Sequence, residues 1–281
     1  MSQKALPYLL LLPATAFLCV FFLYPFALVA VEAFTGPNGP TLDHFQNMIG
    51  YWKFPTTFWN TVLLAAAVVP VQTVMALGMA SVVAKMEKGR SAVLYILTIP
   101  LGISDLAAGI IWLAIFDQSG FLNSILHSFG LVSQPVMFLG YQNKAVIFLA
   151  VALAEIWRAT AIMLVIIVAG MGLIPKEYYE AAEVFGASPW QRFIKVTLPL
   201  LRPSLQTALI LRTILAFEVF AVVAALGGTN LPVLMGETYN WQFNLQDHNV
   251  AAAYALVILA ISIGFTLFFL RTLRVPREAQ I

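Results

Sequence analysis

Residues 145–174 read AVIFLAVALAEIWRATAIMLVIIVAGMGLI, an apolar run in which Glu155 and Arg158 are the only charged residues. A helix that crosses about 30 Å of hydrocarbon needs about 20 predominantly apolar residues, so this run is long enough to span a membrane. Backbone polar groups in lipid must be satisfied within the segment itself. This favours a helix, since a lipid-facing β-barrel would show short segments of alternating polarity.

Five further apolar runs lie on either side of this one, and the six together predict an all-α polytopic membrane protein. The expected transmembrane helices cover about residues 7–33, 59–84, 92–116, 145–174, 205–226 and 250–270. We interpret the first as a retained signal anchor, because it exceeds the usual apolar region of a signal peptide and lacks a convincing small-residue cleavage site. We expect one transmembrane domain over residues 1–281.

The composition excludes several other classes of protein. Hydrophobic residues make up 61% of the 281 residues and charged residues 10%, with a mean hydropathy of +0.88. Soluble domains average about 45–50% and about 25%, and a soluble enzyme of this size could not bury so much apolar surface. The net charge of +2 indicates no nucleic-acid partner. The single cysteine, Cys19, lies in an apolar run and cannot form an intrachain disulfide.

Lysine and arginine are distributed unevenly between the two expected faces of the membrane. With six spans, both termini lie on one side, which carries eleven of the fifteen cations: Lys4, Lys85, Lys88, Arg90, Lys176, Arg192, Lys195, Arg202, Arg271, Arg274 and Arg277. The other side has only Lys53 and Lys144. Because cytoplasmic loops carry the excess of Lys and Arg, we expect both termini to be cytoplasmic.

The cytoplasmic loop at about residues 175–203 has signals for two short helices around a turn. Gly186 stands where the first helix should stop, because glycine tolerates the left-handed conformation found there. Ser188 suits the N-cap of the second helix, with Pro189 at its first position and Gln191 completing a capping box. The loop therefore predicts a rigid helical hairpin, which could pack against its own bundle or insert into a soluble partner.

At these residues the chain resembles the permeases of ABC importers. Glu180, Ala181 and Ala182, then Gly186, then Leu198 and Pro199 match the spacing of that family's EAA loop. Other stretches are similar to its carbohydrate-uptake branch, with maltose-type and glycerol-phosphate-type subunits: Pro25, residues 198–203, 217–220 and 226–228. The chain has Phe185 where that branch usually has Asp, and Leu226-Gly227-Gly228-Thr229-Asn230 replaces its usual Thr-Gly-Gly-Gly-Pro. The first departure bears on the seating of the loop and the second on the substrate class.

The resemblance implies a non-catalytic permease subunit in the bacterial inner membrane, for a sugar or sugar-like solute delivered by an external solute-binding protein. It also implies a second, similar permease and a separate ATPase dimer that binds ATP and Mg²⁺ and receives the loop. Glu180 would pair with a basic residue of the ATPase, Ala181 and Ala182 would permit close approach, and Gly186 would set the bend. The sequence contains no phosphate-binding Gly-x-x-x-x-Gly-Lys-[Ser/Thr] motif, so we expect no bound cofactor.

Five ionisable residues fall within the expected spans: Asp105, Glu155, Arg158, Arg212 and Glu218. Because a charge at the bilayer centre costs at least ~2.5–3.5 kcal/mol, each should face protein or water. Glu155 and Arg158, three residues apart, can pair on one helix face. Asp105 then needs Arg212 or Arg158, while Arg212 and Glu218 point apart and need other partners. These charged residues either form neutralising pairs that stabilise the helix bundle or line a polar pathway for the solute.

Other functions fit the sequence less well. His44, His127 and His248 are far apart and have no metal-ligand spacing, so we predict no metal site. Aromatic residues near the outer membrane edge suit an interfacial belt, or alternatively a docking face for an external partner: Tyr51, Trp52, Trp59, Tyr239 and Trp241. An ABC permease for an amino acid, phosphate ester or polyamine is the main alternative. A stand-alone carrier would leave the cytoplasmic loop unexplained, and a membrane enzyme would need a catalytic cluster that the sequence lacks.

Overall fold

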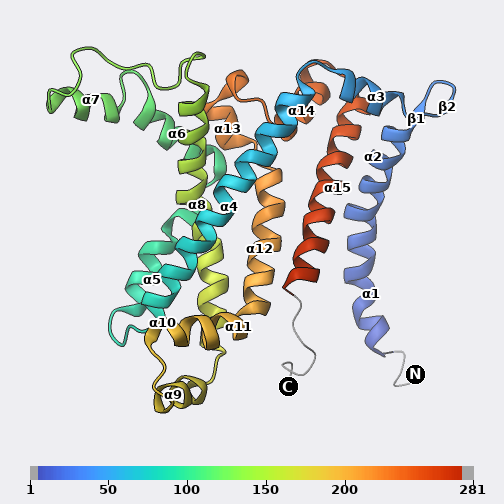
Figure 1. Cartoon of the computed structure of the whole chain (residues 1–281). Helices are drawn as coiled ribbons and strands as arrows, with labels where there is room; N and C mark the ends of the chain where they lie inside the picture. Colours follow the sequence, from blue (N-terminus) through green and yellow to red (C-terminus); the bar gives the residue numbers. More distant parts are fainter. Residues whose placement is uncertain (1–5, 274–281) are drawn as a thin grey trace. The chain divides into compact units, whose positions relative to one another are not determined.

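The computed structural model describes residues 6–273 and is almost entirely helical (Figure 1). The only strands in this range are β1 (Thr35–Gly36) and β2 (Gly39–Pro40), an antiparallel pair in which Thr35 faces Pro40. The all-α prediction is therefore confirmed. Three cations used to predict the orientation, Lys4, Arg274 and Arg277, lie outside the described residues. The chain forms two compact units, and the helices α4 and α15 each contribute to both.

The first unit contains residues 1–55 and 234–259. Its elements are α1 (Leu6–Leu18), η1 (Cys19–Leu23), α2 (Tyr24–Phe34), β1, β2, α3 (Asp43–Gly50), α14 (Leu234–Tyr239), η5 (Asn240–Asn244) and the first part of α15 (His248–Thr272). His44 bonds the Thr35 carbonyl through Nε2 at 3.0 Å and lies 3.3 Å from Asn249 Nδ2. These contacts join the strand pair and α3 to the start of α15.

The second unit contains residues 56–233 and 260–281. Its elements are most of α4 (Phe54–Ala84), then α5 (Arg90–Thr98), η2 (Ile99–Gly102), α6 (Asp105–Phe116), α7 (Phe121–Ser128), α8 (Lys144–Gly172), α9 (Lys176–Val184), α10 (Pro189–Arg192), η3 (Phe193–Thr197), α11 (Leu198–Leu200), α12 (Arg202–Phe217), α13 (Ala221–Leu226), η4 (Gly228–Asn230) and the end of α15. Within this unit, α9 and α10 project at one end and α7 lies at the opposite end (Figure 1).

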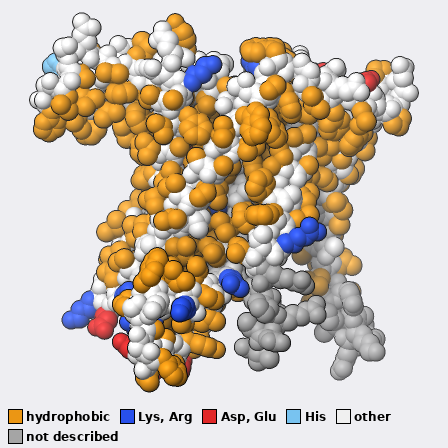
Figure 2. Space-filling model, in the orientation of Figure 1, with side chains coloured by type: hydrophobic (Ala, Val, Ile, Leu, Met, Phe, Trp, Pro, Cys, Tyr) orange, Lys and Arg blue, Asp and Glu red, His pale blue; other side chains and the backbone are white. Residues whose placement is uncertain are grey.

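Five helical stretches are long and apolar enough to cross a membrane: Leu9–Phe34, Phe54–Ala84, Asp105–Ser128, Lys144–Gly172 and His248–Thr272. A sixth span arises if Pro189–Leu200 and Arg202–Phe217, which meet at a bend of 70°, are taken together. The structure therefore has five spans, or the predicted six if the bent pair is counted as one span. The apolar side chains cover the flanks of these helices (Figure 2).

The expected continuous helix over residues 92–116 is wrong. The chain instead forms α5, a 3₁₀ segment at Ile99–Gly102 and a new helix from Asp105. Pro100 cannot donate a backbone hydrogen bond and Gly102 is a poor helix former, so the α-helix stops here. Ser104 then caps α6, accepting a hydrogen bond from the amide of Ala107 at 3.2 Å.

The expected continuous helix over residues 205–226 is also wrong. Helix α12 begins earlier, at Arg202, and ends at Phe217, and α13 starts only at Ala221 after a short non-helical segment. No glycine or proline marks this break. Phe217 on one side and Val222 on the other are both buried, and the Phe217 ring packs 5.2 Å from that of Phe265 on α15. The break between α12 and α13 thus lies among packed side chains, and no residue in the sequence marks it.

Helices α4, α8 and α12 form the core of the second unit. Together with Leu201, which directly precedes α12, they contribute one cluster of buried residues: Ala76, Ala80, Met163, Leu164, Ile167, Val168, Met171, Leu205 and Ala208. Gly170 on α8 lies so close to Ser204 on α12 that a Cβ at this position would collide with the serine side chain. Small residues at helix contacts let backbones approach closely in membrane proteins, where packing rather than hydrophobic burial drives association.

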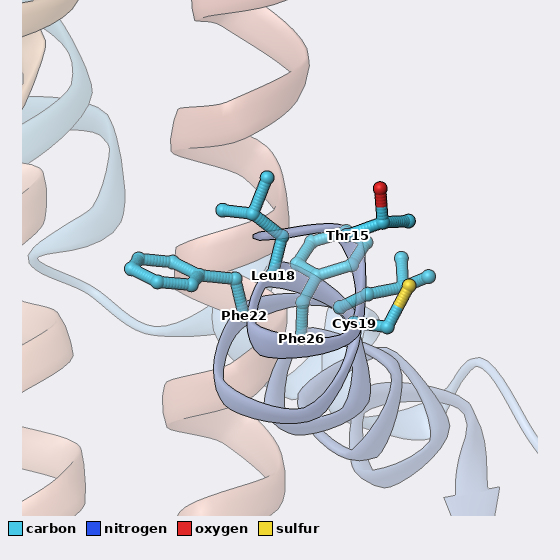
Figure 3. A pocket seen from close by; sticks show the side chains of 6 residues that line it. Thr15, Leu18, Cys19, Phe22 and Phe26 are labelled. Atoms are coloured by element: carbon cyan, nitrogen blue, oxygen red, sulfur yellow. The ribbon is translucent and has the colours of Figure 1, made fainter. Parts of the chain in front are cut away.

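The first span, Leu9–Phe34, is exposed along most of its length, and Ala33 near its end is buried. One shallow apolar hollow lies on it, lined by Thr15, Leu18, Cys19, Phe22, Leu23 and Phe26, all from α1, η1 and α2 (Figure 3). Cys19 is an exposed thiol on this face. Because the lining is almost entirely apolar and comes from one helical stretch, the hollow is suited to lipid chains rather than to a polar ligand.

Candidate functional site

The hairpin that the sequence predicts to be cytoplasmic is defined here as α9, the following turn and α10, and it has the local geometry that its sequence predicts. Gly186 has φ +75°, and its amide donates to the Glu183 carbonyl at 2.9 Å, while the next amide reaches Ala182 at 2.9 Å. Both halves of the Ser188–Gln191 capping box are present. The predicted turn and cap are confirmed. Pro175 is the N-cap of α9.

The tip of the hairpin exposes large apolar side chains. Val184 is 85%, Phe185 89% and Trp190 69% exposed. Glu180 and Ala181 are exposed and Ala182 is partly buried. Arg192 pairs with Glu183 at 3.1 Å, whereas Glu180 has no ion pair among residues 6–273. The surface thus offers an unpaired carboxylate beside an apolar knob, which a partner could cover.

The hairpin is firmly joined to the bundle. After α10 the chain passes through η3 and α11, which carries Leu198 and Pro199, and bends by 70° into α12. Phe193 and Leu198 pack against the buried core of α4, α8 and α12. A displacement of the hairpin would therefore act on the base of α12.

A second constellation, the charge network, joins four helices in the interior of the second unit. Arg212 on α12 donates from Nη2 to Glu155 Oε2 on α8 at 2.8 Å, and from Nε to Gln72 Oε1 on α4 at 2.6 Å. Gln72 Nε2 in turn donates to the Glu155 backbone carbonyl at 2.8 Å. Arg158 Nη1 lies 2.7 Å from Asp105 Oδ1 on α6, and its Nη2 lies 3.8 Å from Glu155 Oε1.

The structure brings four of the five expected intramembrane charges together. Glu155 and Arg158 face each other as predicted, Asp105 has Arg158 as its partner, and Arg212 has Glu155. Glu218 is exposed and has no ion pair within the described part of the chain. Gln72 was not identified from the sequence as a member of this network. Its position as a polar amide in the middle of an apolar run could have indicated it.

The first unit contains a polar group around Glu237 and four of the five aromatic residues expected at the outer membrane edge: Tyr51, Trp52, Tyr239 and Trp241. Trp59 belongs to the second unit. Glu237, buried on α14, lies 3.7 Å from Lys53 Nζ and 3.2 Å from Asn240 Nδ2. The rings of Tyr51 and Trp241 meet edge to face at 5.3 Å, while Trp52 is exposed. These contacts fit an interfacial belt and a docking face equally, so both interpretations remain predictions.

Comparison with known proteins places this architecture in one family. The model for "Binding-protein-dependent transport system inner membrane component" matches residues 72–280. The chain is 29% identical to the trehalose/maltose transport system permease protein MalF of Thermococcus litoralis, over 98% of this chain and 96% of that protein. It is 31% identical to the sulfoquinovosyl glycerol transport system permease protein SmoG of Agrobacterium fabrum, over 98% and 92%.

Solved structures agree on the fold. A bacterial ABC transporter involved in the import of the acidic polysaccharide alginate matches with a TM-score of 0.83 at 23% identity, over 96% of this chain and 95% of that one. A bacterial alginate ABC transporter in complex with its alginate pentasaccharide-bound periplasmic protein also matches with a TM-score of 0.83, at 22% identity over 98% and 95%. The family match covers most of the chain, so the protein belongs to the binding-protein-dependent inner membrane components, the multi-pass, non-catalytic and cofactor-free permease subunits of ABC transporters.

Proposed function

We propose that this chain forms one half of the translocation pathway of an ATP-driven importer for a sugar or sugar-like solute. The names of its relatives support this class of cargo, since they concern trehalose or maltose, sulfoquinovosyl glycerol and alginate. An external solute-binding protein delivers the solute, as the periplasmic protein in the alginate complex suggests. A second, similar permease completes the pathway.

The observation that carries the coupling role is the exposed tip of the cytoplasmic hairpin. Its apolar side chains, Val184, Phe185 and Trp190, stand at the end of a polar, tightly capped segment rather than on the flank of a span. Burial of such side chains in a partner is favourable by about 25 cal/mol per Å². We assign this surface to the cleft of a separate ATPase dimer, with Glu180 pairing to a basic residue there.

The connection between the hairpin and α12 determines how motion of the ATPase would reach the membrane helices. Closure of the ATPase dimer on ATP moves the hairpin, and η3 and α11 pass the motion to the base of α12. Arg212 binds α12 to α8 and α4, so these helices tilt together. The pathway then opens alternately to each side, with the hairpin and both termini on the cytoplasmic face of the inner membrane.

The test is ATP hydrolysis by the co-purified complex, basal and stimulated by the solute-binding protein. Glu180→Lys and Gly186→Pro should abolish stimulation, because one reverses the pairing charge and the other breaks the φ +75° turn. The chain offers matched controls in the loop between α4 and α5: Glu87→Lys at an exposed carboxylate, and Gly89→Pro at a glycine with φ +74°.

The controls should retain stimulation, since nothing assigns their loop to the ATPase. If no ATPase co-purifies, or if the hairpin variants behave as their controls do, the coupling role is wrong. A complex that hydrolyses ATP normally but responds to no carbohydrate-loaded binding protein would overturn the class of cargo while leaving the coupling role in place.

A further inference from the structure

The chain between α6 and α8 is unusually apolar for a connection between two spans. Residues 118–143 contain no Asp, Glu, Lys or Arg. Within them, α7 and the loop that follows it form what we call the arm, residues 121–139. Its large apolar side chains point outward, since Phe121 is 65%, Phe129 77% and Leu131 70% exposed. Exposed apolar surface of this kind marks contact with a membrane or with another protein.

The arm has a fixed shape and is fastened to α6. Asn123 is buried and exchanges two hydrogen bonds with the backbone of Val136, donating to its carbonyl at 2.9 Å and accepting from its amide at 2.9 Å. Asn123 also donates to the Gln118 carbonyl at 3.1 Å, and the Phe138 ring lies 6.3 Å from that of Phe116 on α6. The exposed apolar side chains therefore stand on an ordered element.

Helix α7 separates apolar from polar side chains. Phe121 and Ile125 within the helix and Phe129 directly after it are spaced four residues apart, so they lie on one side, and all three are exposed. Polar residues occupy the other side: Ser124, His127 and Ser128. Figure 2 shows hydrophobic side chains gathered along the lower edge of this part of the molecule, toward the apolar flanks of the spans.

The charge network shows at which depth α7 begins. Asp105, the first residue of α6, pairs at 2.7 Å with Arg158, the middle residue of the spanning helix α8. The 12 residues of α6 extend about 18 Å, whereas half of the hydrocarbon layer is about 15 Å thick. A helix that starts near the middle of the membrane and has this length ends at the edge of the hydrocarbon. Helix α7 therefore starts at the headgroup layer.

The direction of α7 favours lipid over a protein partner. The helix extends sideways from the second unit, away from α8, after a tight turn in which a Cβ on Gly120 would lie 2.5 Å from the Ala114 carbonyl (Figure 1). Helices α6 and α7 belong to one apolar stretch, little of which is buried within the chain, and Leu106 and Ile110 on α6 are exposed as well. The apolar side of α7 thus continues the lipid-facing surface of a span.

We propose that the arm lies on the surface of the membrane opposite to the hairpin, as an interfacial helix that inserts Phe121, Ile125 and Phe129 among the acyl chains. A helix with one apolar and one polar side binds in this way at the boundary between headgroups and acyl chains. Because residues 118–143 contain no Lys or Arg, binding depends on apolar burial and not on anionic lipid. The proposal requires only that the chain spans a membrane, and does not rest on the importer function.

The depth of the two sides of α7 can be measured with spin labels. In a Cys19→Ala background, a nitroxide is attached at Ile125→Cys on the apolar side or, as the matched control on the polar side of the same helix, at His127→Cys. Both positions are exposed. The permease and its co-purifying subunits are placed in phosphatidylcholine vesicles with or without phosphatidylglycerol. Collision rates of each label with oxygen, which concentrates in hydrocarbon, and with a water-soluble nickel chelate are then measured by electron paramagnetic resonance.

We expect the oxygen-to-nickel collision ratio to be several-fold higher at position 125 than at position 127. The ratios should be the same in both lipid mixtures, because the arm offers no cation to an anionic headgroup. A difference between the two positions that appears only with phosphatidylglycerol would overturn binding by apolar burial.

Three other results would also overturn the proposal. Equal access of the nickel chelate to both labels would place the arm in water. High ratios at both positions would place α7 inside the hydrocarbon, as a continuation of α6. A label at position 125 that is shielded from both reagents would show that a protein covers this surface. None of these readouts depends on ATP hydrolysis or on the cargo, so failure here leaves the importer function untouched.

Discussion

Arg212 is the residue on which the interior of the second unit depends most. Its guanidinium group has five donors in a fixed plane, so one side chain can bond Glu155 on α8 and Gln72 on α4 at once. A buried pair of this kind contributes little net stability compared with apolar residues of equal volume. Loss of one partner, however, leaves an uncompensated charge in a medium that solvates it poorly.

We expect Arg212→Met to destabilise the permease by about 3–5 kcal/mol, because Glu155 then remains buried without its cation. The double variant Arg212→Met with Glu155→Met should recover much of this loss, since no charge is left behind. Thermal unfolding of the complex in lipid nanodiscs measures both. Arg202→Met, at an exposed arginine on the same helix, is the control and should change the unfolding temperature little. Additive losses in the double variant would contradict this account.

At the scale of elements, prolines explain two of the three π-helical segments in residues 6–273. The segments η1 and η3 each end two residues before a proline, at Leu23 before Pro25 and at Thr197 before Pro199. Proline has no amide hydrogen and its ring clashes with the carbonyl four residues earlier, so the helix widens locally to avoid it. In η3 this widening lies between the hairpin and α12.

The contact of α6 with α13 depends on the absence of a side chain at Gly109. A Cβ there would lie 2.7 Å from Ala225 Cβ and 3.2 Å from Val222 Cα. We expect Gly109→Val to force the two helices apart and to cost about 1–3 kcal/mol, as overpacking typically does. The unfolding temperature of the complex checks this. Gly78→Val on α4, where a Cβ meets nothing within 4 Å, should cost clearly less; equal costs would show that the close approach is unimportant.

The capping box controls the order of the hairpin. Ser188→Ala removes the acceptor for the Gln191 amide, now 3.3 Å from Ser188 Oγ, and should cost about 1 kcal/mol. Hydrogen exchange of the amides in α10 should therefore become roughly fivefold faster, if local opening governs it. Ser188→Asp preserves a capping acceptor and should exchange as the parent does. Unchanged exchange in Ser188→Ala would mean that the turn is held by other contacts.

The hairpin was predictable from sequence because its signals are local. Gly186, Ser188 and Gln191 act on neighbouring amides, so no knowledge of the bundle is needed. The long apolar helices were predictable from length and composition for the same reason. The break after Phe217 was not, because it lacks a breaking residue, and the break at Pro100 was hidden by the high apolarity of its surroundings. The partners of Asp105 and Arg212 lie on other helices, so spacing alone left them open.

At the scale of the whole molecule, the distribution of cations is the main argument for orientation. Lys85, Lys88 and Arg90 lie between α4 and α5, while Lys144 alone opens α8 at the other end of the same unit. Figure 2 shows Lys and Arg side chains gathered around the end that carries α9 and α10. The positive-inside rule predicts that this end lies in the cytoplasm, where an ATPase could reach it.

Cysteine accessibility tests this orientation directly, because Cys19 is the only native thiol. In a Cys19→Ala background, Gln142→Cys, in the exposed loop before α8, should react with a membrane-impermeant maleimide in intact cells. Glu87→Cys and Glu183→Cys, both at exposed positions on the cation-rich end, should react only after permeabilisation. The opposite pattern would place the hairpin outside, beyond the reach of a cytoplasmic ATPase, and would remove the coupling role together with the orientation.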